Sequence, residues 1–162
     1  MWIKWLVGGI ILVAVLAVAA GQLGFLQGTA PVDVGVRNGR LKPPSPTENS
    51  VTSQAALYPD HPQRFHAAVV PLPLNGDGPA TMSRIKTIVD GMSGAKVVKS
   101  TPDYLYAQFT TQWMKFVDDV EFWFDPVNNV IQVRSASRLG SKDLGVNRKR
   151  VEAVRAALAG TQ

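Results

Sequence analysis

The sequence predicts an α+β fold: a two-layer sandwich in which helices pack on one face of a mainly antiparallel sheet, preceded by an N-terminal transmembrane helix. An uncharged apolar run fills the start of the chain, alternating segments follow one another from residue 96 to residue 136, and apolar residues recur at helical spacing in 81–92 and 147–158. Consecutive alternating segments favour antiparallel pairing. Helices with one apolar stripe cover one side of such a sheet, which gives two layers around a core.

The first element is the apolar run Trp5–Leu26, in which Gln22 is the one polar residue and no residue is charged. As a helix rising about 1.5 Å per residue, it would be roughly 33 Å long and would cross a bilayer. Trp2 and Trp5 lie at its start, where indole rings favour the membrane interface. This run predicts a membrane anchor, so the membrane is the first expected partner.

A cleaved signal peptide is the alternative interpretation of this run. Lys4 would form its charged start and Ala17–Ala19 its cleavage site. The apolar run continues past that site, which favours a retained anchor. Lys4 also favours a cytoplasmic N-terminus, although Arg37, Arg40 and Lys42 follow the run and compete with it. We expect a single-pass protein of the cell inner membrane whose soluble domain lies on the periplasmic side.

The chain divides into segments by composition. Residues 1–27 are the anchor or signal segment, residues 28–48 a flexible linker rich in Pro and Gly, and residues 49–160 the α+β domain. The many prolines of the lead-in leave no room for a regular element there. Within the domain, the expected elements are a strand at 67–72, a helix at 81–92, strands at 96–99, 104–111, 117–125 and 130–136, and a helix at 147–158.

The last hairpin predicts which side chains face the core. In its first strand, alternation places Val120 and Phe122 on one face, and Asp119 and Glu121 on the other. Because the connection has four residues, Glu121 faces Arg134 in the return strand, and one apolar face normally fixes such a register. The second face of the sheet is polar, as expected of a solvated face.

The candidate site is a polar centre where the acidic strand, the return strand and the start of the last helix meet. Arg148, Lys149 and Arg150 begin that helix, where its dipole disfavours each cation by roughly a few tenths of a kcal/mol. Either nearby carboxylates compensate internally, or an external phosphate, carboxylate or lipid headgroup does. We expect Arg134, Arg138 and Arg148 to converge beside the acidic strand. The candidate binding residues are Asp118, Glu121, Arg134, Ser135, Ser137, Arg138, Asp143, Asn147, Arg148 and Arg150.

Asp118 raises the question of catalysis, because alternation places it on the apolar face, where a carboxylate demands a cationic partner. It supports a hydrolase hypothesis. Adjacent Asp118 and Asp119 point to opposite faces, however, and do not form a paired acid and base. No nucleophile elbow, phosphate-binding loop or dinucleotide fingerprint occurs in the sequence. Enzymatic activity therefore stays open, with no catalytic residue and no cofactor indicated.

The composition excludes several kinds of site. Cysteine is absent, which excludes disulfides, thiolate catalysis and zinc–thiolate sites. His61 and His66 flank Pro62 in a loop, so structural or exposed histidines are expected rather than a metal site. The net charge of +5 would suit a polyanion, but an exported, tethered domain meets anionic lipid rather than nucleic acid.

Motifs in the C-terminal half carry a family resemblance. The runs Asp118–Phe122, Arg134–Gly140 and Asp143–Arg150 resemble the domain of unknown function 1499 family, and the resemblance extends over roughly residues 41–158. The resemblance implies a membrane-associated setting and brings no established activity.

Three function hypotheses follow. The first is a membrane-anchored, exported module that binds or assembles with a partner, such as another protein, without catalysis. The second is a receptor for a small anionic ligand or a lipid headgroup at the Arg-rich start of the last helix. The third is a hydrolase that uses Asp118. Complete internal pairing of the arginines favours the first, and a ligand-free cavity lined by Arg134, Arg138 and Arg148 favours the second.

Overall fold

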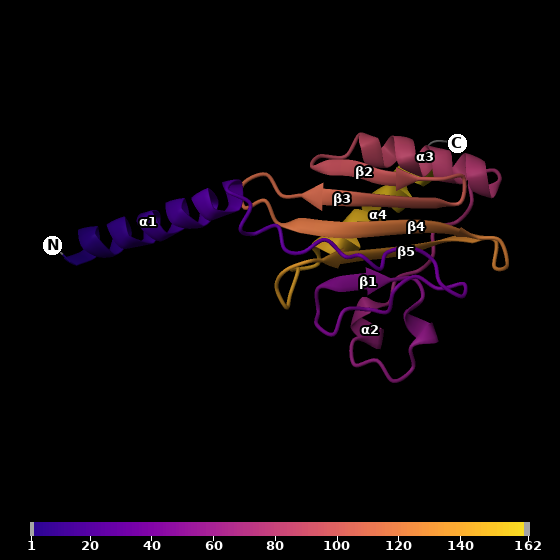
Figure 1. The fold of residues 1–162 in the computed structure, drawn as a ribbon, viewed down its shortest axis with the longest axis horizontal. Coiled ribbons are helices and arrows are strands. Elements are labelled where there is room, and N and C mark those ends of the chain that lie inside the picture. The colour runs from indigo at the N-terminus through magenta and orange to yellow at the C-terminus, as the bar shows by residue number, and fades with distance from the viewer. Residues whose placement is uncertain (1, 161–162) are drawn as a thin grey trace.

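A five-stranded antiparallel sheet forms the centre of the domain in this computed structural model, which describes residues 2–160 (Figure 1). Strands β2 to β5 form a meander, and the short strand β1 pairs with β5 at one edge. The predicted α+β class is confirmed. In sheet order, the strands are β1 (Ser50–Thr52), β5 (Val130–Ser137), β4 (Val117–Asp125), β3 (Tyr104–Thr110) and β2 (Ala95–Ser100).

Helices α3 (Gly78–Asp90) and α4 (Val146–Gly160) cover one face of the sheet and bury its apolar side chains. Asp77 begins α3 by accepting a hydrogen bond from the backbone N–H of Ala80, as expected of an N-cap residue. Phe122 is fully buried between the sheet and these helices. The two-layer arrangement predicted from the helical stripes is therefore present.

The register of the β4–β5 hairpin is the predicted one. Glu121 is the cross-strand neighbour of Arg134, and Phe122 is the neighbour of Val133. Val120 and Phe122 point into the helix-covered core, as alternation predicts.

The second face of the sheet is covered by residues 33–43, which we name the strap. Val34, Val36 and Leu41 of the strap pack against Tyr104, Tyr106 and Trp123 of the sheet. The backbone N–H of Gly35 donates to Glu121, and that of Leu41 donates to Gln54. The prediction of a solvated second face is therefore wrong. The strap has no periodic pattern that would reveal its contact with strands far away in sequence.

The segment between β1 and α3 also differs from the prediction. Residues 67–72 do not form a strand. Helix α2 (Arg64–Ala67) ends there, and the segment makes two isolated bridges, from Ala68 to Thr52 and from Leu72 to Ile131. Short 3₁₀ helix η1 (Ala55–Leu57) precedes α2. Strand β1 escaped prediction because three residues with one apolar side chain show no alternation.

Helix α1 (Trp2–Gln22) projects from one end of the domain and is almost entirely exposed (Figure 1). Its 21 apolar-rich residues make it long enough to cross a membrane. The helix ends four residues before the predicted boundary at Leu26. Gly24 has a positive φ of 87°, and the N–H of Phe25 donates back to Ala20, which together form a glycine-dependent C-cap.

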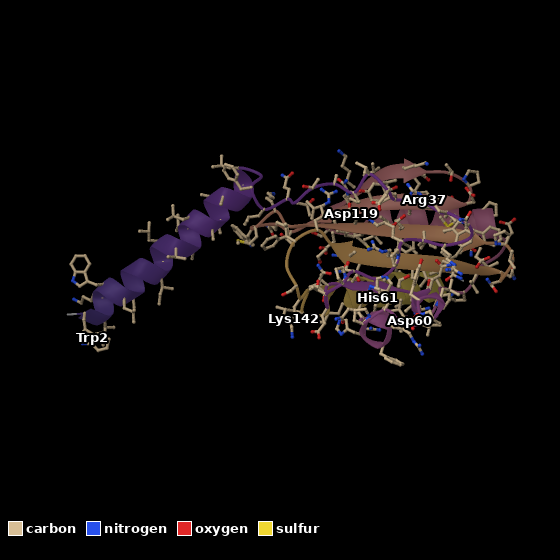
Figure 2. All side chains as sticks on the ribbon, turned by 60° about the horizontal axis from the view of Figure 1, so that its bottom comes forward. Trp2, Arg37, Asp60, His61, Asp119 and Lys142 are labelled. Atoms are coloured by element: carbon tan, nitrogen blue, oxygen red, sulfur yellow. The ribbon has the colours of Figure 1, made fainter. Side chains whose placement is uncertain are left out.

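Three segments meet where α1 joins the domain: residues 23–28, the β3–β4 loop (111–116) and the β5–α4 loop (138–145). We name them together the anchor end. The side chain of Gln22 donates to the backbone oxygens of Gln112 and Trp113 at 3.3 and 2.9 Å. Figure 2 shows Lys142 at this end of the domain and Trp2 at the far end of the helix.

Candidate functional site

The sheet divides the predicted polar centre into two clusters, because neighbouring residues of a strand point to opposite faces. The helix-face cluster contains Asp118, Ser135, Ser137, Asn147 and Arg150. The strap-face cluster contains Asp119, Glu121, Arg134 and Arg138, joined by the tyrosines Tyr104 and Tyr106.

Arg150 organises the helix-face cluster. Its guanidinium donates to Asp118 Oδ2 at 2.6 Å, to Ser135 Oγ at 3.0 Å and to Asn147 Oδ1 at 2.8 Å. It also lies over the ring of Phe109, 4.5 Å from the centroid. The side chains of Arg150 and Asp118 are 9% and 8% exposed, so this ion pair is almost completely removed from solvent.

Asn147 connects three elements within the same cluster. Its Nδ2 donates to the backbone oxygen of Asn49 at 3.1 Å and to Ser137 Oγ at 3.0 Å, while its Oδ1 accepts from Ser135 Oγ at 2.5 Å. The fully buried amide thereby ties the start of α4 to β5 and to the residue before β1.

Asp143 caps the start of α4. Its Oδ2 accepts from the backbone N–H of Asn147 at 2.9 Å, and its Oδ1 accepts from that of Gly145 at 3.0 Å. Partial burial would raise the pKa of Asp143, but these backbone N–H groups outweigh it and lower that pKa below 3.8. An internal carboxylate thus already occupies the position at the helix start where an external anion would sit.

A bidentate ion pair forms the first half of the strap-face cluster. Arg138 donates from Nε and from an Nη to the two oxygens of Asp119, both at 2.8 Å. Tyr106 donates to Asp119 Oδ1 at 2.5 Å and accepts from Gln108. The hydrogen bond to Asp119 raises the pKa of the Arg138 guanidinium.

Glu121 and Arg134 form the second half without a direct ion pair. Glu121 is fully buried, and its Oε1 accepts from Tyr104 and from the backbone of Gly35, both at 2.7 Å. Its Oε2 has no hydrogen-bond partner within residues 2–160. Arg134 donates from Nε to the backbone oxygen of Pro43. Burial lowers the pKa of Arg134, and the nearby carboxylate of Glu121 acts in the opposite direction.

Arg148 lies apart from both clusters. Its guanidinium donates to the backbone oxygens of His66 and Ala68, at 2.6 and 2.9 Å, and fixes α2 to α4. The expected convergence is therefore wrong for Arg148, whereas Arg134 and Arg138 lie beside the acidic strand as expected. Helix phase explains it: at about 100° per residue, Arg148 and Arg150 point roughly 200° apart, and Arg150 is the one that reaches the sheet.

The sequence interpretation missed several residues of the clusters. Tyr104 and Tyr106 stand opposite Trp123 and Glu121 across β3 and β4. Alternation along β3 was the signal that could have placed both tyrosines beside the acidic residues. No signal of that kind exists for Asn49 or Gly35, whose contacts depend on distant loops.

Two neighbouring pockets flank the start of α4 at the anchor end, and both include Thr111 and Val146 in their walls. The first has a volume of about 270 Å³. Its walls include the apolar side chains of Phe116, Leu139 and Leu144 and the charged ones of Asp118, Lys142 and Asp143. The second, of about 510 Å³, carries the cationic side chains of Lys149 and Arg150; we name them the apolar pocket and the cationic pocket.

Metal coordination finds no support in the part of the chain that the structure describes. No group of three or more His, Cys, Asp or Glu side chains in residues 2–160 is arranged to hold a metal ion. His61 accepts a hydrogen bond from the backbone of Gln63 within the loop before α2.

Comparison with known proteins gives one match. A family model described as protein of unknown function (DUF1499) matches residues 40–158. The chain belongs to this family. No curated protein and no solved structure matches it. In this DUF1499 protein, the matched segment contains the sheet, α3, both polar clusters and α4 up to residue 158. It excludes α1 and Gly35, whose backbone donates to Glu121.

Proposed function

We propose that this DUF1499 protein is a membrane-anchored, non-catalytic binding module whose ligand enters at the anchor end. One contrast carries the proposal. The aspartates of both polar clusters are taken up by internal arginines, whereas the apolar and cationic pockets beside α4 hold no side chain from the rest of the chain. The clusters therefore build the scaffold, and the pockets offer the binding space.

Internal pairing argues against a catalytic role for Asp118. This residue lines the apolar pocket, but one of its oxygens is held by Arg150 at 2.6 Å. The almost completely buried ion pair gives Asp118 a structural role as the partner of Arg150 on α4. Neither histidine of the chain is among the residues that line either pocket. The second carboxylate of the apolar pocket, that of Asp143, accepts from the backbone N–H groups of Gly145 and Asn147.

The ligand that suits these pockets is an amphiphile with an apolar body and an anionic head. Its apolar part would fill the apolar pocket, between Phe116 and Leu144, and its head would lie beside Lys149 in the cationic pocket. A membrane lipid has this chemistry. A free anion at the start of α4 has less support, because Asp143 already caps that helix.

The proposed location is the cell inner membrane, with α1 as a single retained span and the domain on the periplasmic side. Lys4 at the start of α1 supports this orientation, because positive residues favour the cytoplasmic side. A single cysteine replacing Val127, which is 90% exposed, tests it in a chain that has no other cysteine. In spheroplasts, a membrane-impermeant maleimide should label Val127→Cys, and protection of that residue would reverse the proposed orientation.

Native mass spectrometry of the full chain released from lipid nanodiscs tests the ligand. We expect wild type to retain one bound amphiphile and Val146→Trp to lose it, because Val146 lines both pockets. Val127→Trp, in the β4–β5 turn, is the matched control and should retain it. Equal retention by wild type and Val146→Trp, or no retention by either, would contradict the proposal.

A thermal-shift measurement separates the two sources of an anionic head. Dodecyl phosphate should raise the melting temperature of wild type through binding to the native state, and inorganic phosphate alone should not. The same shift with both probes would instead identify a site for a free anion.

A further inference from the structure

The end of α1 is fastened to the domain rather than joined through a loose connection. Gln22 donates to two backbone oxygens of the β3–β4 loop. Gly21 packs so closely on Met114 that a Cβ there would overlap the Met114 carbonyl oxygen. Six residues beyond α1, Gly28 lies against the side chains of Arg138 and Leu139. The helix end is therefore held by both loops of the anchor end.

This attachment fixes where the anchor end lies when α1 spans a bilayer. A helix of 21 residues is about 32 Å long, which matches a hydrocarbon core of about 30 Å. Gln22, at its end, is then at the lipid–water interface. The β3–β4 loop bonds directly to Gln22 and so lies at the same level.

Large apolar side chains project from this end of the domain. Leu144 is 87% exposed, Trp113 67% and Phe25 76%. Each comes from a different segment of the anchor end, so the fold and not one sequence run brings them to the same end of the domain. Contiguous exposed apolar surface is uncommon on soluble domains and marks contact sites, and tryptophan in particular favours the membrane interface.

Basic side chains accompany the apolar ones. Lys115 lies in the β3–β4 loop, and Lys149 lines the cationic pocket together with Thr111 and Gln112 of that loop. Lys142 in the β5–α4 loop forms an exposed ion pair with Glu48. Lysines next to a bilayer gain about 1 kcal/mol each from anionic lipid. The combination of apolar residues with flanking lysines matches an anionic lipid surface.

We propose that the anchor end is a lipid-binding surface that inserts Trp113 and Leu144 into the interface of the bilayer that α1 crosses. This surface shares Leu144 and Lys149 with the walls of the pockets of the proposed function, but it contacts many lipids from outside and does not require one amphiphile to be bound. The domain then lies on the membrane instead of standing away from it.

Spin labels on single cysteines test the proposal, because the native chain contains none. Leu144→Cys and Trp113→Cys report on the anchor end, and Val127→Cys is the control, since all three side chains are largely exposed. The full chain is placed in nanodiscs of phosphatidylglycerol or of phosphatidylcholine. Electron paramagnetic resonance then compares collisions of each label with oxygen, which concentrates in lipid, and with a water-soluble nickel chelate.

We expect the labels at 113 and 144 to favour oxygen over nickel by several-fold relative to the label at 127. The preference should be greater in phosphatidylglycerol, and Lys149→Glu should reduce it there without reducing it in phosphatidylcholine. Labels at 144 and 127 with the same oxygen-to-nickel ratio would overturn the proposal. Low collision rates with both reagents at 144 would also overturn it, since they indicate cover by protein, such as a second copy of the chain. Labels at 113 and 144 that contact lipid, in a chain that retains no bound amphiphile in native mass spectrometry, would contradict only the proposed function.

Discussion

At the scale of single residues, two adjacent carboxylates of β4 pair with different arginines. Asp118 pairs with Arg150 on the helix side of the sheet, and Asp119 pairs with Arg138 on the strap side. A buried ion pair adds little to net stability compared with apolar packing, yet removing one partner leaves a buried charge without compensation. The two ion pairs therefore hold α4 and the β5–α4 loop against the sheet.

Asp119→Asn should destabilise the domain by about 3–5 kcal/mol, because the Arg138 guanidinium, 8% exposed, loses its counter-charge. Chemical denaturation of the full chain in detergent measures this change. Asp33→Asn is the control: its pair with Lys42 is 46% and 27% exposed, so we expect a loss of less than about 1 kcal/mol. Similar losses for both variants would show that burial does not set the strength of the Asp119 pair.

At the scale of secondary-structure elements, the β4–β5 hairpin shows how much of the fold the sequence could predict. Its register and the orientation of Phe122 follow from alternation, because a local pattern and a short turn determine them. The partner of Glu121 could not be predicted in the same way. Gly35, which donates to it, lies 86 residues away in a segment without periodicity. Which of Arg148 and Arg150 reaches Asp118 depended on how α4 is rotated about its axis against the sheet, and this is a tertiary contact that no local pattern determines.

Phe122→Ala should cost about 3–5 kcal/mol of unfolding free energy, as for an aromatic side chain removed from a packed core. Trp123→Ala should cost clearly less, because Trp123 is only partly buried and packs against the strap. Denaturation midpoints of the two variants compare them directly. A larger loss for Trp123→Ala would mean that the strap face, and not the helix face, contains the dominant core.

At the scale of the whole molecule, the strap joins the apolar helix α1 to the far side of the sheet. Its backbone supplies a hydrogen bond to the fully buried Glu121, and Leu41 is almost completely buried beside Tyr104. The family match begins at residue 40 and so leaves most of the strap outside. The folding unit is nevertheless larger than the matched segment, since the sheet uses the strap as its second cover.

A soluble piece that begins at Thr29 should therefore be more stable than one that begins at Pro44. Loss of Leu41 alone removes about 1.5–3 kcal/mol of apolar burial, which lowers the melting temperature by on the order of 10 °C in a domain of this size. Differential scanning calorimetry of the two pieces measures the difference. Equal melting temperatures would show that the strap only rests on the sheet.

The hydrogen bonds between Gln22 and the β3–β4 loop couple the orientation of the projecting helix α1 to that of the domain (Figure 1). A span that is longer than the local hydrocarbon thickness tilts to keep its apolar residues in lipid. A helix fastened at its end transmits that tilt as a rotation of the whole sheet. Membranes of different thickness would then present different sides of the same domain to the surrounding solution.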